Sequence, residues 1–226
     1  SISDHVEIKA GVETMLRSYH EIIVKQFAQT KYLFDEAIPA AFVEADVYAT
    51  NDFIMRGGFR AEYNNLLRSV SIDPRVSLAY KLGPHGQAAF AYGKFRQSAK
   101  DEFIKIKPEL CSENAAHYIL NYQYTKANKT FRAEVYYKDY TKLVKYNGRD
   151  PFDLSSDGSG HAKGIEAFWR DNGSINHLDY WISYSFLDSK RDYLDFPHSA
   201  VPAFASKHNF SIVTKYFVRK IKSQLG

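Results

Sequence analysis

Three acidic residues near the end of the chain are the clearest candidates for metal chemistry. Asp188, Asp192 and Asp195 lie close together in the sequence, and carboxylate oxygens are the ligands that Ca²⁺ and similar hard cations prefer. Lys190 and Arg191 lie among them and would compete with a cation for the carboxylates. A cation site in a loop is therefore one interpretation, and a solvated charged loop is the favoured one.

Other residues that could catalyse a reaction are scattered. The 8 histidines include no pair at i,i+2 or i,i+4, the spacings that bring two imidazoles to one metal ion. The sequence has no nucleophile elbow, zinc-protease motif or phosphate-binding glycine loop. The segment DGSGHAKG (157–164) is interpreted as a loop that enters a strand, and Cys111 as a residue of a long loop without a role. We therefore expect no enzyme, no metal site and no cofactor.

The overall composition excludes several other classes. Hydrophobic residues make up 45% of the 226 residues and charged residues 25%, so the chain is not of a disordered type. The net charge of +4 comes without a basic tract, which argues against a nucleic-acid partner. One cysteine excludes an internal disulfide, and we find no signal peptide and no apolar run of about 18 residues. Residues 1–226 are treated as a single region without a second domain.

Alternation of apolar and polar residues is the strongest structural signal. It predicts about ten strands of roughly 8–12 residues, near the 9–11 that a tilted membrane strand needs. Residues 11–28 could also form an amphipathic helix, but we expect a strand followed by a loop. The strands are expected near residues 5–14, 40–49, 53–63, 74–82, 87–94, 117–124, 130–140, 161–170, 177–186 and 208–217.

The expected connections fall into two kinds that alternate along the chain. Short turns are expected at residues 49–52, 83–86, 126–129 and 171–176, where Asn, Gly and Pro suit hairpins. Long connections are expected at residues 16–39, 64–73, 95–116, 141–160 and 187–207. In an up-and-down meander this places all long loops at one end, as in outer-membrane barrels. The C-terminal segment VRKIKSQLG is interpreted as a turn that opens another strand.

Alternation does not by itself say which face meets water. In a soluble sheet the apolar face is the core, whereas in a membrane barrel it meets lipid and the polar face lines a wet lumen. Long strands, one-sided loops and aromatic residues near strand ends favour the barrel, because amphipathic rings are stable at the bilayer interface. The residues expected to face lipid include Ala41, Val43, Ala45, Val47, Phe53, Met55 and Phe59. Those expected to line the lumen are Glu44, Asp46, Arg56, Arg60, Glu62, Arg132, Glu134, Glu166, Arg170 and Asp179.

Five fragments follow one another over nearly the whole chain. In order they are AAFVEADVYATNDFIMRGGFRAEY, DPRVSLAYKLGPHGQAAFAYGKFRQ, NAAHYILNYQYTKANKTFRAEVYYKDYTKLV, GSGHAKGIEAFWRDNGSINHLDYWISYSFLDSKRDY and ASKHNFSIVTKYF. In their order and spacing they resemble the TonB-dependent outer-membrane receptors. The resemblance implies an all-β, antiparallel transmembrane barrel, of which this chain would be an interior fragment, since such barrels have 22 strands. No plug domain or TonB box is recognised here.

The resemblance also implies a function and partners. Receptors of this family import siderophore, haem, cobalamin or oligosaccharide-type substrates through the outer membrane of Gram-negative bacteria. Their partners are membrane lipid, the imported substrate and the TonB complex, which acts through an N-terminal region absent from this sequence. Long loops would be extracellular and short turns periplasmic, and Tyr146, Phe152, Tyr193 and Phe196 are the loop residues proposed to contact substrate. A plugless diffusion porin and a soluble all-β binding module are the alternatives.

Overall fold

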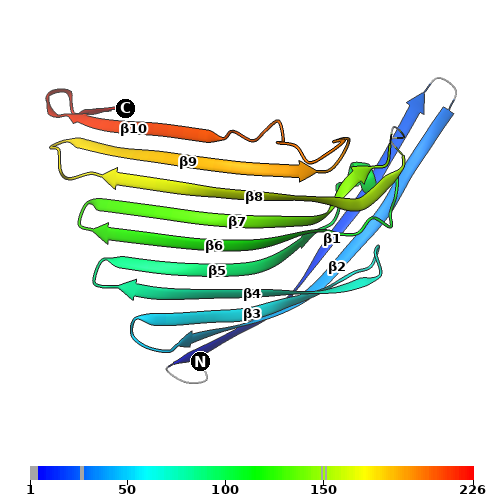
Figure 1. The fold of residues 1–226 in the computed structure, drawn as a ribbon, viewed down its shortest axis with the longest axis horizontal. Helices are drawn as coiled ribbons and strands as arrows, with labels where there is room; N and C mark the ends of the chain where they lie inside the picture. The colour runs from blue at the N-terminus through cyan, green and yellow to red at the C-terminus, as the bar shows by residue number, and fades with distance from the viewer. Residues whose placement is uncertain (1–4, 26–27, 149, 151) are drawn as a thin grey trace.

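The computed structural model describes residues 5–25, 28–148, 150 and 152–226 as one antiparallel β-sheet. The described residues form eleven strands, and each strand is hydrogen-bonded to the next one in the sequence (Figure 1). The strands are β1 Val6–Lys25, β2 Ala28–Tyr48, β3 Phe53–Asn64, β4 Ser69–Leu82, β5 Gly86–Gln97, β6 Glu113–Lys126, β7 Lys129–Tyr146, β8 Leu154–Asp171, β9 Leu178–Asp192, β10 His208–Val218 and β11 Ser223–Leu225. The sheet is open, because β1 and β11 are at its two edges. This confirms the predicted all-β, up-and-down topology.

Tight turns join the strands at one end of the sheet, which we call the turn end (left in Figure 1). The Thr50 Oγ1 atom accepts hydrogen bonds from the backbone N–H groups of Asp52 and Phe53, at 3.2 and 3.0 Å. Asp171 in the same way accepts from the N–H groups of Gly173 and Ser174. These side chains satisfy backbone donors that the sheet leaves unpaired, which is the usual role of Thr and Asp in turns.

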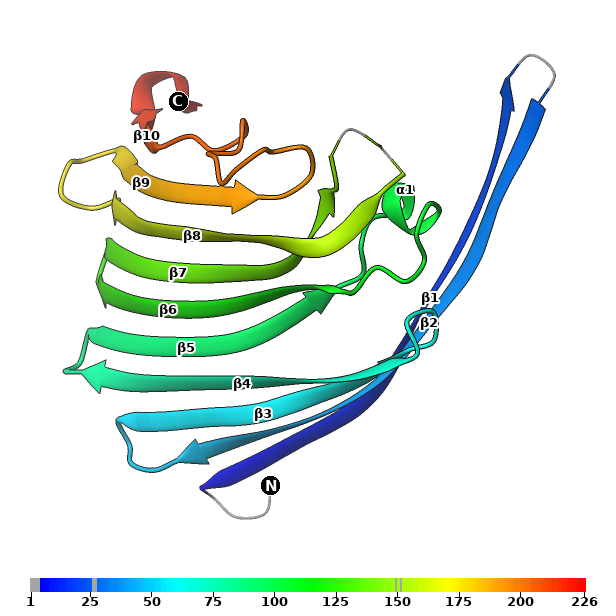
Figure 2. The same cartoon turned by 45° about the vertical axis from the view of Figure 1, so that its right-hand side comes forward.

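The opposite, loop end differs from the sequence prediction at three connections. Strand β1 continues to Lys25 and pairs without interruption with β2, from Val6↔Val47 to Lys25↔Ala28. The loop predicted at residues 16–39 is therefore a long hairpin, and it projects beyond the other strands (Figure 2). The predicted connection at 64–73 is also short, because β4 begins at Ser69. Polar residues continue the strand pairing here, so the end of the apolar alternation did not mark the end of the strand.

The β5–β6 and β9–β10 connections are long, as predicted, but the connection predicted at residues 141–160 spans only 147–153, and residues 157–164, predicted as a loop, belong to β8. Most strands exceed the expected 8–12 residues; β7 and β8 each have 18. At the C-terminus, a 3₁₀ turn at Arg219–Ile221 and the left-handed Lys222 (φ 52°) return the chain, so that β11 pairs with β10. The predicted turn opening another strand is thus confirmed.

One helix interrupts the β structure among the described residues. Helix α1, Asp101–Ile104, lies between β5 and β6, and no helix was predicted there. It contributes to a small hydrophobic core at the loop end, formed by Phe34, Ala99, Phe103, Ile104, Leu110, Val144 and Leu154. No described helix is long and apolar enough to span a membrane.

Candidate functional site: the two faces of the sheet

The strand register places the predicted lumen-lining residues on one face of the sheet. Residues that are directly paired across antiparallel strands point to the same side, and alternate residues along a strand do as well. Asp46 pairs with Arg56, and Glu134 pairs with Glu166. Following the register from strand to strand brings all ten predicted residues to one surface, the polar face. That this face lines a lumen stays a prediction.

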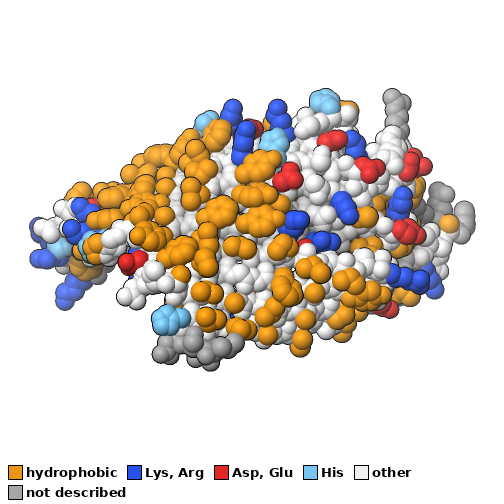
Figure 3. All heavy atoms as spheres, turned by 60° about the horizontal axis from the view of Figure 1, so that its bottom comes forward, with side chains coloured by type: hydrophobic (Ala, Val, Ile, Leu, Met, Phe, Trp, Pro, Cys, Tyr) orange, Lys and Arg blue, Asp and Glu red, His pale blue; other side chains and the backbone are white. Residues whose placement is uncertain are grey.

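The opposite, apolar face carries large hydrophobic side chains in the open. Val12 and Leu16 are 84% and 77% exposed, and Val70, Leu120 and Val135 are also exposed. Figure 3 shows hydrophobic side chains over a broad area of the molecule toward the turn end, with basic side chains at the turn-end edge and side chains of both charges toward the loop end. Soluble monomers rarely expose a continuous apolar patch larger than a few hundred Å², so this face needs an apolar neighbour.

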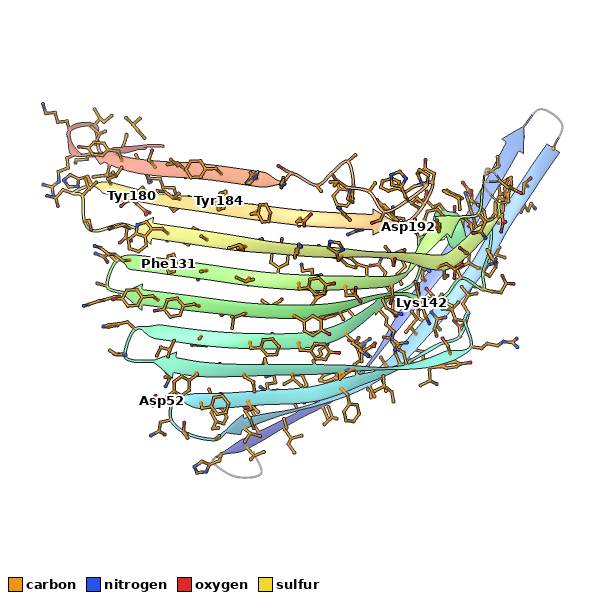
Figure 4. All side chains as sticks on the ribbon, in the orientation of Figure 1. Asp52, Phe131, Lys142, Tyr180, Tyr184 and Asp192 are labelled. Atoms are coloured by element: carbon orange, nitrogen blue, oxygen red, sulfur yellow. The ribbon has the colours of Figure 1, made fainter. Side chains whose placement is uncertain are left out.

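Aromatic rings border the apolar area at the turn end. Phe131 and Tyr180 lie there, whereas Lys142 and Asp192 lie at the loop end (Figure 4). Ring centroids of neighbouring strands are close, with Phe131 and Trp169 at 6.5 Å. The rings of the apolar face within two positions of the turn end of their strand are Phe53, Tyr80, Tyr124, Phe131, Trp169, Tyr180 and Tyr216.

A second row of rings and a row of charges close the apolar area toward the loop end. Tyr118 lies between Tyr92 and Tyr137, with centroids 5.0 and 6.2 Å away. The next residues along the same face are charged, namely Lys94, Asp139, Lys163 and Asp188. An apolar band between two aromatic rows is the pattern of a strand that crosses a bilayer.

Charges on the polar face of β1, β2 and β3 are largely paired with one another. Asp46 is 3% exposed and accepts from Arg56 Nη2 at 2.8 Å and from Lys9 Nζ at 3.0 Å. Arg60 pairs with Glu62 at 3.0 Å and also with Glu13. These pairs form a ladder of opposite charges across the three strands.

The polar face of β6 to β10 is arranged differently. Glu134 and Glu166 are directly opposed, and neither has a cationic partner among the described residues. Arg132 likewise forms no ion pair with a described residue. The three line a hollow of about 700 Å³, together with the amides and hydroxyls of Asn121, Gln123, Ser183, Ser185, Asn209 and Ser211. This sector has unused hydrogen-bonding capacity.

Aromatic rings also occur on the polar face, and sequence reasoning missed them. The Arg75 guanidinium lies 4.9 Å from the Phe95 ring centre, and Lys215 Nζ lies 5.0 Å from the ring of Trp181. Two adjacent aromatic residues within a predicted strand are the sequence signal that could have identified some of these polar-face rings. In Tyr180–Trp181 the two side chains must point to opposite faces of a strand, so one ring of such a pair belongs to the polar face.

The four loop residues proposed for substrate contact lie at the loop end, where the Tyr146 N–H donates to the carbonyl oxygen of Leu194, next to Tyr193, at 3.0 Å. Tyr146 packs against Phe103 at the edge of the small core, with ring centroids 6.2 Å apart. Tyr193 and Phe196 pack edge to face at 5.1 Å in the β9–β10 connection, and Phe152 is exposed in the β7–β8 connection. Their contact with a substrate stays a prediction.

Two of the three acidic residues considered for a cation site, Asp188 and Asp192, are paired with lysines. Asp188 lies 3.4 Å from Lys163, and Asp192 pairs with Lys145. In the part of the chain that the structure describes, no group of three or more His, Cys, Asp or Glu side chains could hold a metal ion. Cys111 is exposed in the β5–β6 connection.

Known structures of the same fold are outer-membrane transporters. The chain superposes on the FrpB iron transporter of Neisseria meningitidis with a TM-score of 0.75 and 9% identity, covering 99% of this chain and 39% of that one. It superposes on Fiu, the ferric-catecholate import receptor of Escherichia coli K12, with a TM-score of 0.67 and 12% identity, covering 94% of this chain and 39% of Fiu. For the copper transporter OprC the TM-score is 0.64 at 12% identity, and the superposition covers 83% of this chain and 36% of OprC.

No protein-family model matches the sequence, and no curated protein matches it either. The chain spans about two fifths of the length of the structures on which it superposes. At these identities the comparison concerns the fold, and at that level it confirms the resemblance to TonB-dependent receptors.

Proposed function

We propose that this sheet is part of the wall of an outer-membrane barrel that imports a scarce nutrient in a TonB-dependent manner. The observation that carries the proposal is the exposed apolar face, bounded by aromatic rows and then by charges, opposite a polar face with a wide hollow. A lipid environment accounts for the first face and a water-filled lumen for the second. The coupling to TonB would involve parts of the protein outside these residues.

The cargo is proposed at the level of its class. The similar structures bear the names of iron, ferric-catecholate and copper transporters, which favours a metal ion or its complex over haem, cobalamin or an oligosaccharide. In this proposal the long connections are extracellular and the tight turns periplasmic. Solute would then enter from the loop end and pass along the polar face.

A pair of neighbouring residues tests which face meets lipid. Val135 lies on the apolar face and Glu134 on the polar face, one position apart on β7. We expect Val135→Arg in the full-length protein to lower the free energy of unfolding by about 2–4 kcal/mol, the cost of an arginine near the bilayer midplane. Glu134→Arg introduces the same side chain on the other face and should cost far less. The measurement is urea unfolding in lipid vesicles.

Membrane location and transport need separate assays. Heat-modifiable migration on SDS gels, with protein purified from outer membranes, is the expected behaviour of a folded barrel. A protein found wholly in the soluble fraction without detergent would overturn the proposal. Single-channel recordings would identify a plugless porin by a permanently open conductance, whereas an energy-coupled importer should remain closed.

A further inference from the structure

The β5–β6 connection, residues 98–112, crosses the polar face and is attached at both sides; we call it the strap. On one side it joins the β1–β2 hairpin and β3. Glu36 of β2 is 2% exposed and accepts hydrogen bonds from Ser98 Oγ at 2.6 Å and from Asn64 Nδ2 at 2.7 Å. Arg17 of β1 lies 2.7 Å from Glu36 and 2.7 Å from Asp101 of α1. We call this network the Glu36 anchor.

A second contact on the same side lies nearer the tip of the hairpin. Lys105 Nζ lies 2.6 Å from Glu21 Oε2, and its charge lies 5.2 Å from the Tyr32 ring centre. The Glu21 carboxylate raises the pKa of Lys105, so the lysine is charged at neutral pH. All these contacts are on the polar face, because Arg17, Glu36 and Asn64 belong to it by register.

The other side of the strap joins the ends of β7 and β8. Lys107 Nζ donates to the Leu154 carbonyl oxygen at 2.7 Å, and the Cys111 N–H group donates to Ser156 Oγ at 3.0 Å. Figure 2 shows α1 between the projecting β1–β2 hairpin and these strand ends. The strap therefore runs across the concave side of the curved sheet, from β1–β3 to β7 and β8, and does not follow the strands between them. The side chains that pack beneath it are Phe34, Val144 and Leu154.

The two attachments differ in kind. The attachment to β7 and β8 combines two hydrogen bonds, each between a side chain and a backbone group, with the packing of Val144 and Leu154 against the strap. In the Glu36 anchor, the contacts of Arg17 with Glu36 and Asp101 are short, but Arg17 Nη2, Glu36 Oε2 and Asp101 Oδ1 are not aligned for hydrogen bonding. The anchor side also packs Phe34 of β2 into the hydrophobic core, but it differs from the other side by a buried charge. The Glu36 carboxylate is held by Arg17 and by the hydrogen bonds from Ser98 and Asn64, and removal of one charge partner from such a site is costly.

We infer that the strap is a hinged constriction at the loop end of the sheet. The Glu36 anchor holds it closed, and the attachment to β7 and β8 acts as the hinge. Loss of the anchor frees α1 to move away from the β1–β2 hairpin while residues near Cys111 stay in place. The consequence for solute entry rests on the proposed function, but the motion of the strap does not.

Spin labels at the two ends of the strap test this arrangement in the full-length protein. One label is placed at Lys100→Cys in a Cys111→Ser background, next to the anchor, and the other at the native Cys111, near the hinge. We expect Glu36→Gln and, more weakly, Asp101→Asn to make the label at position 100 predominantly mobile, while the label at Cys111 keeps its spectrum. Glu62→Gln is the matched control, because Glu62 pairs with Arg60 on the same face and has no bond to the strap.

Each outcome decides the inference. An immobile label at position 100 in both Glu36→Gln and Asp101→Asn would show that apolar packing alone holds the strap, and the hinge would be rejected. Equal mobilisation at both labels, or mobilisation by Glu62→Gln, would indicate general loosening and reject it too. Solute uptake into vesicles is measured in parallel: a mobile strap with unchanged uptake would leave the hinge intact and count against the proposed function.

Discussion

Two sectors of the polar face handle charge in opposite ways. In the β1–β3 sector, Asp46, Arg56 and Lys9 satisfy one another, and Arg60 is shared between two glutamates. In the β6–β10 sector, Glu134 and Glu166 are opposed without a cation from any residue that the structure describes. The same sheet, with the same alternation, thus contains a sector whose charges are largely paired and one whose opposed glutamates are not paired with described cations.

The difference indicates separate roles for the two sectors. A self-paired network stabilises the sheet, because charge-assisted hydrogen bonds fix neighbouring strands. Like charges directly opposite each other on a sheet are destabilising, so the β6–β10 sector contributes less to stability than its charge content suggests. Its free carboxylates, amides and hydroxyls are available to solute, to water or to another part of the protein.

Within the polar face, the largest effect should follow from a substitution at the centre of the paired sector. Asp46→Asn removes the charge that holds both Arg56 and Lys9. We expect a loss of about 2 kcal/mol in the free energy of unfolding, the order of hydrogen bonds to a charged group. Because both cations remain half exposed, the loss should stay below that of a fully buried pair. Urea unfolding in vesicles measures it.

Glu44→Gln provides the control for this prediction. Glu44 lies on the same strand and face, and no described residue forms an ion pair with it. Its substitution should change stability by a few tenths of a kcal/mol, as is usual away from buried networks. Equal losses for Asp46→Asn and Glu44→Gln would show that the ladder does not stabilise the sheet and would remove the distinction between the sectors.

The unpaired sector should respond with the opposite sign. Glu134→Gln or Glu166→Gln relieves the repulsion between the two carboxylates, and we expect a gain of about 0.2–1 kcal/mol. The two substitutions should not add, because either one removes the repulsion. A loss of stability in both variants would mean that a partner outside the described residues already neutralises the pair.

The sequence predicted the faces better than the ends of the sheet. Alternation assigned Glu134 and Glu166 to one face, because one-residue steps in a strand fix sidedness. It placed a loop at Leu16, since Ser18 and His20 stand at positions where the alternation requires apolar residues, and it found no role for polar residues such as Arg17 and Glu36. Strand pairing needs only the backbone, and the partners of these polar residues come from the strap, which is distant in sequence. Local patterns carry no information on such contacts.

The smallest effect is expected within the β6–β10 sector, at its turn end. Arg170 donates two hydrogen bonds to Asp179, at 3.0 and 2.8 Å, and both residues are partly exposed. A double-mutant cycle with Arg170→Gln and Asp179→Asn should give a coupling energy of about 0.2–1 kcal/mol, because water and salt screen the pair. The coupling should fall when the salt concentration is raised, whereas the loss caused by Asp46→Asn should not. A coupling energy above that range and insensitive to salt would mean that the Arg170–Asp179 pair is as protected from solvent as Asp46. Paired charges would then characterise the turn end of both sectors.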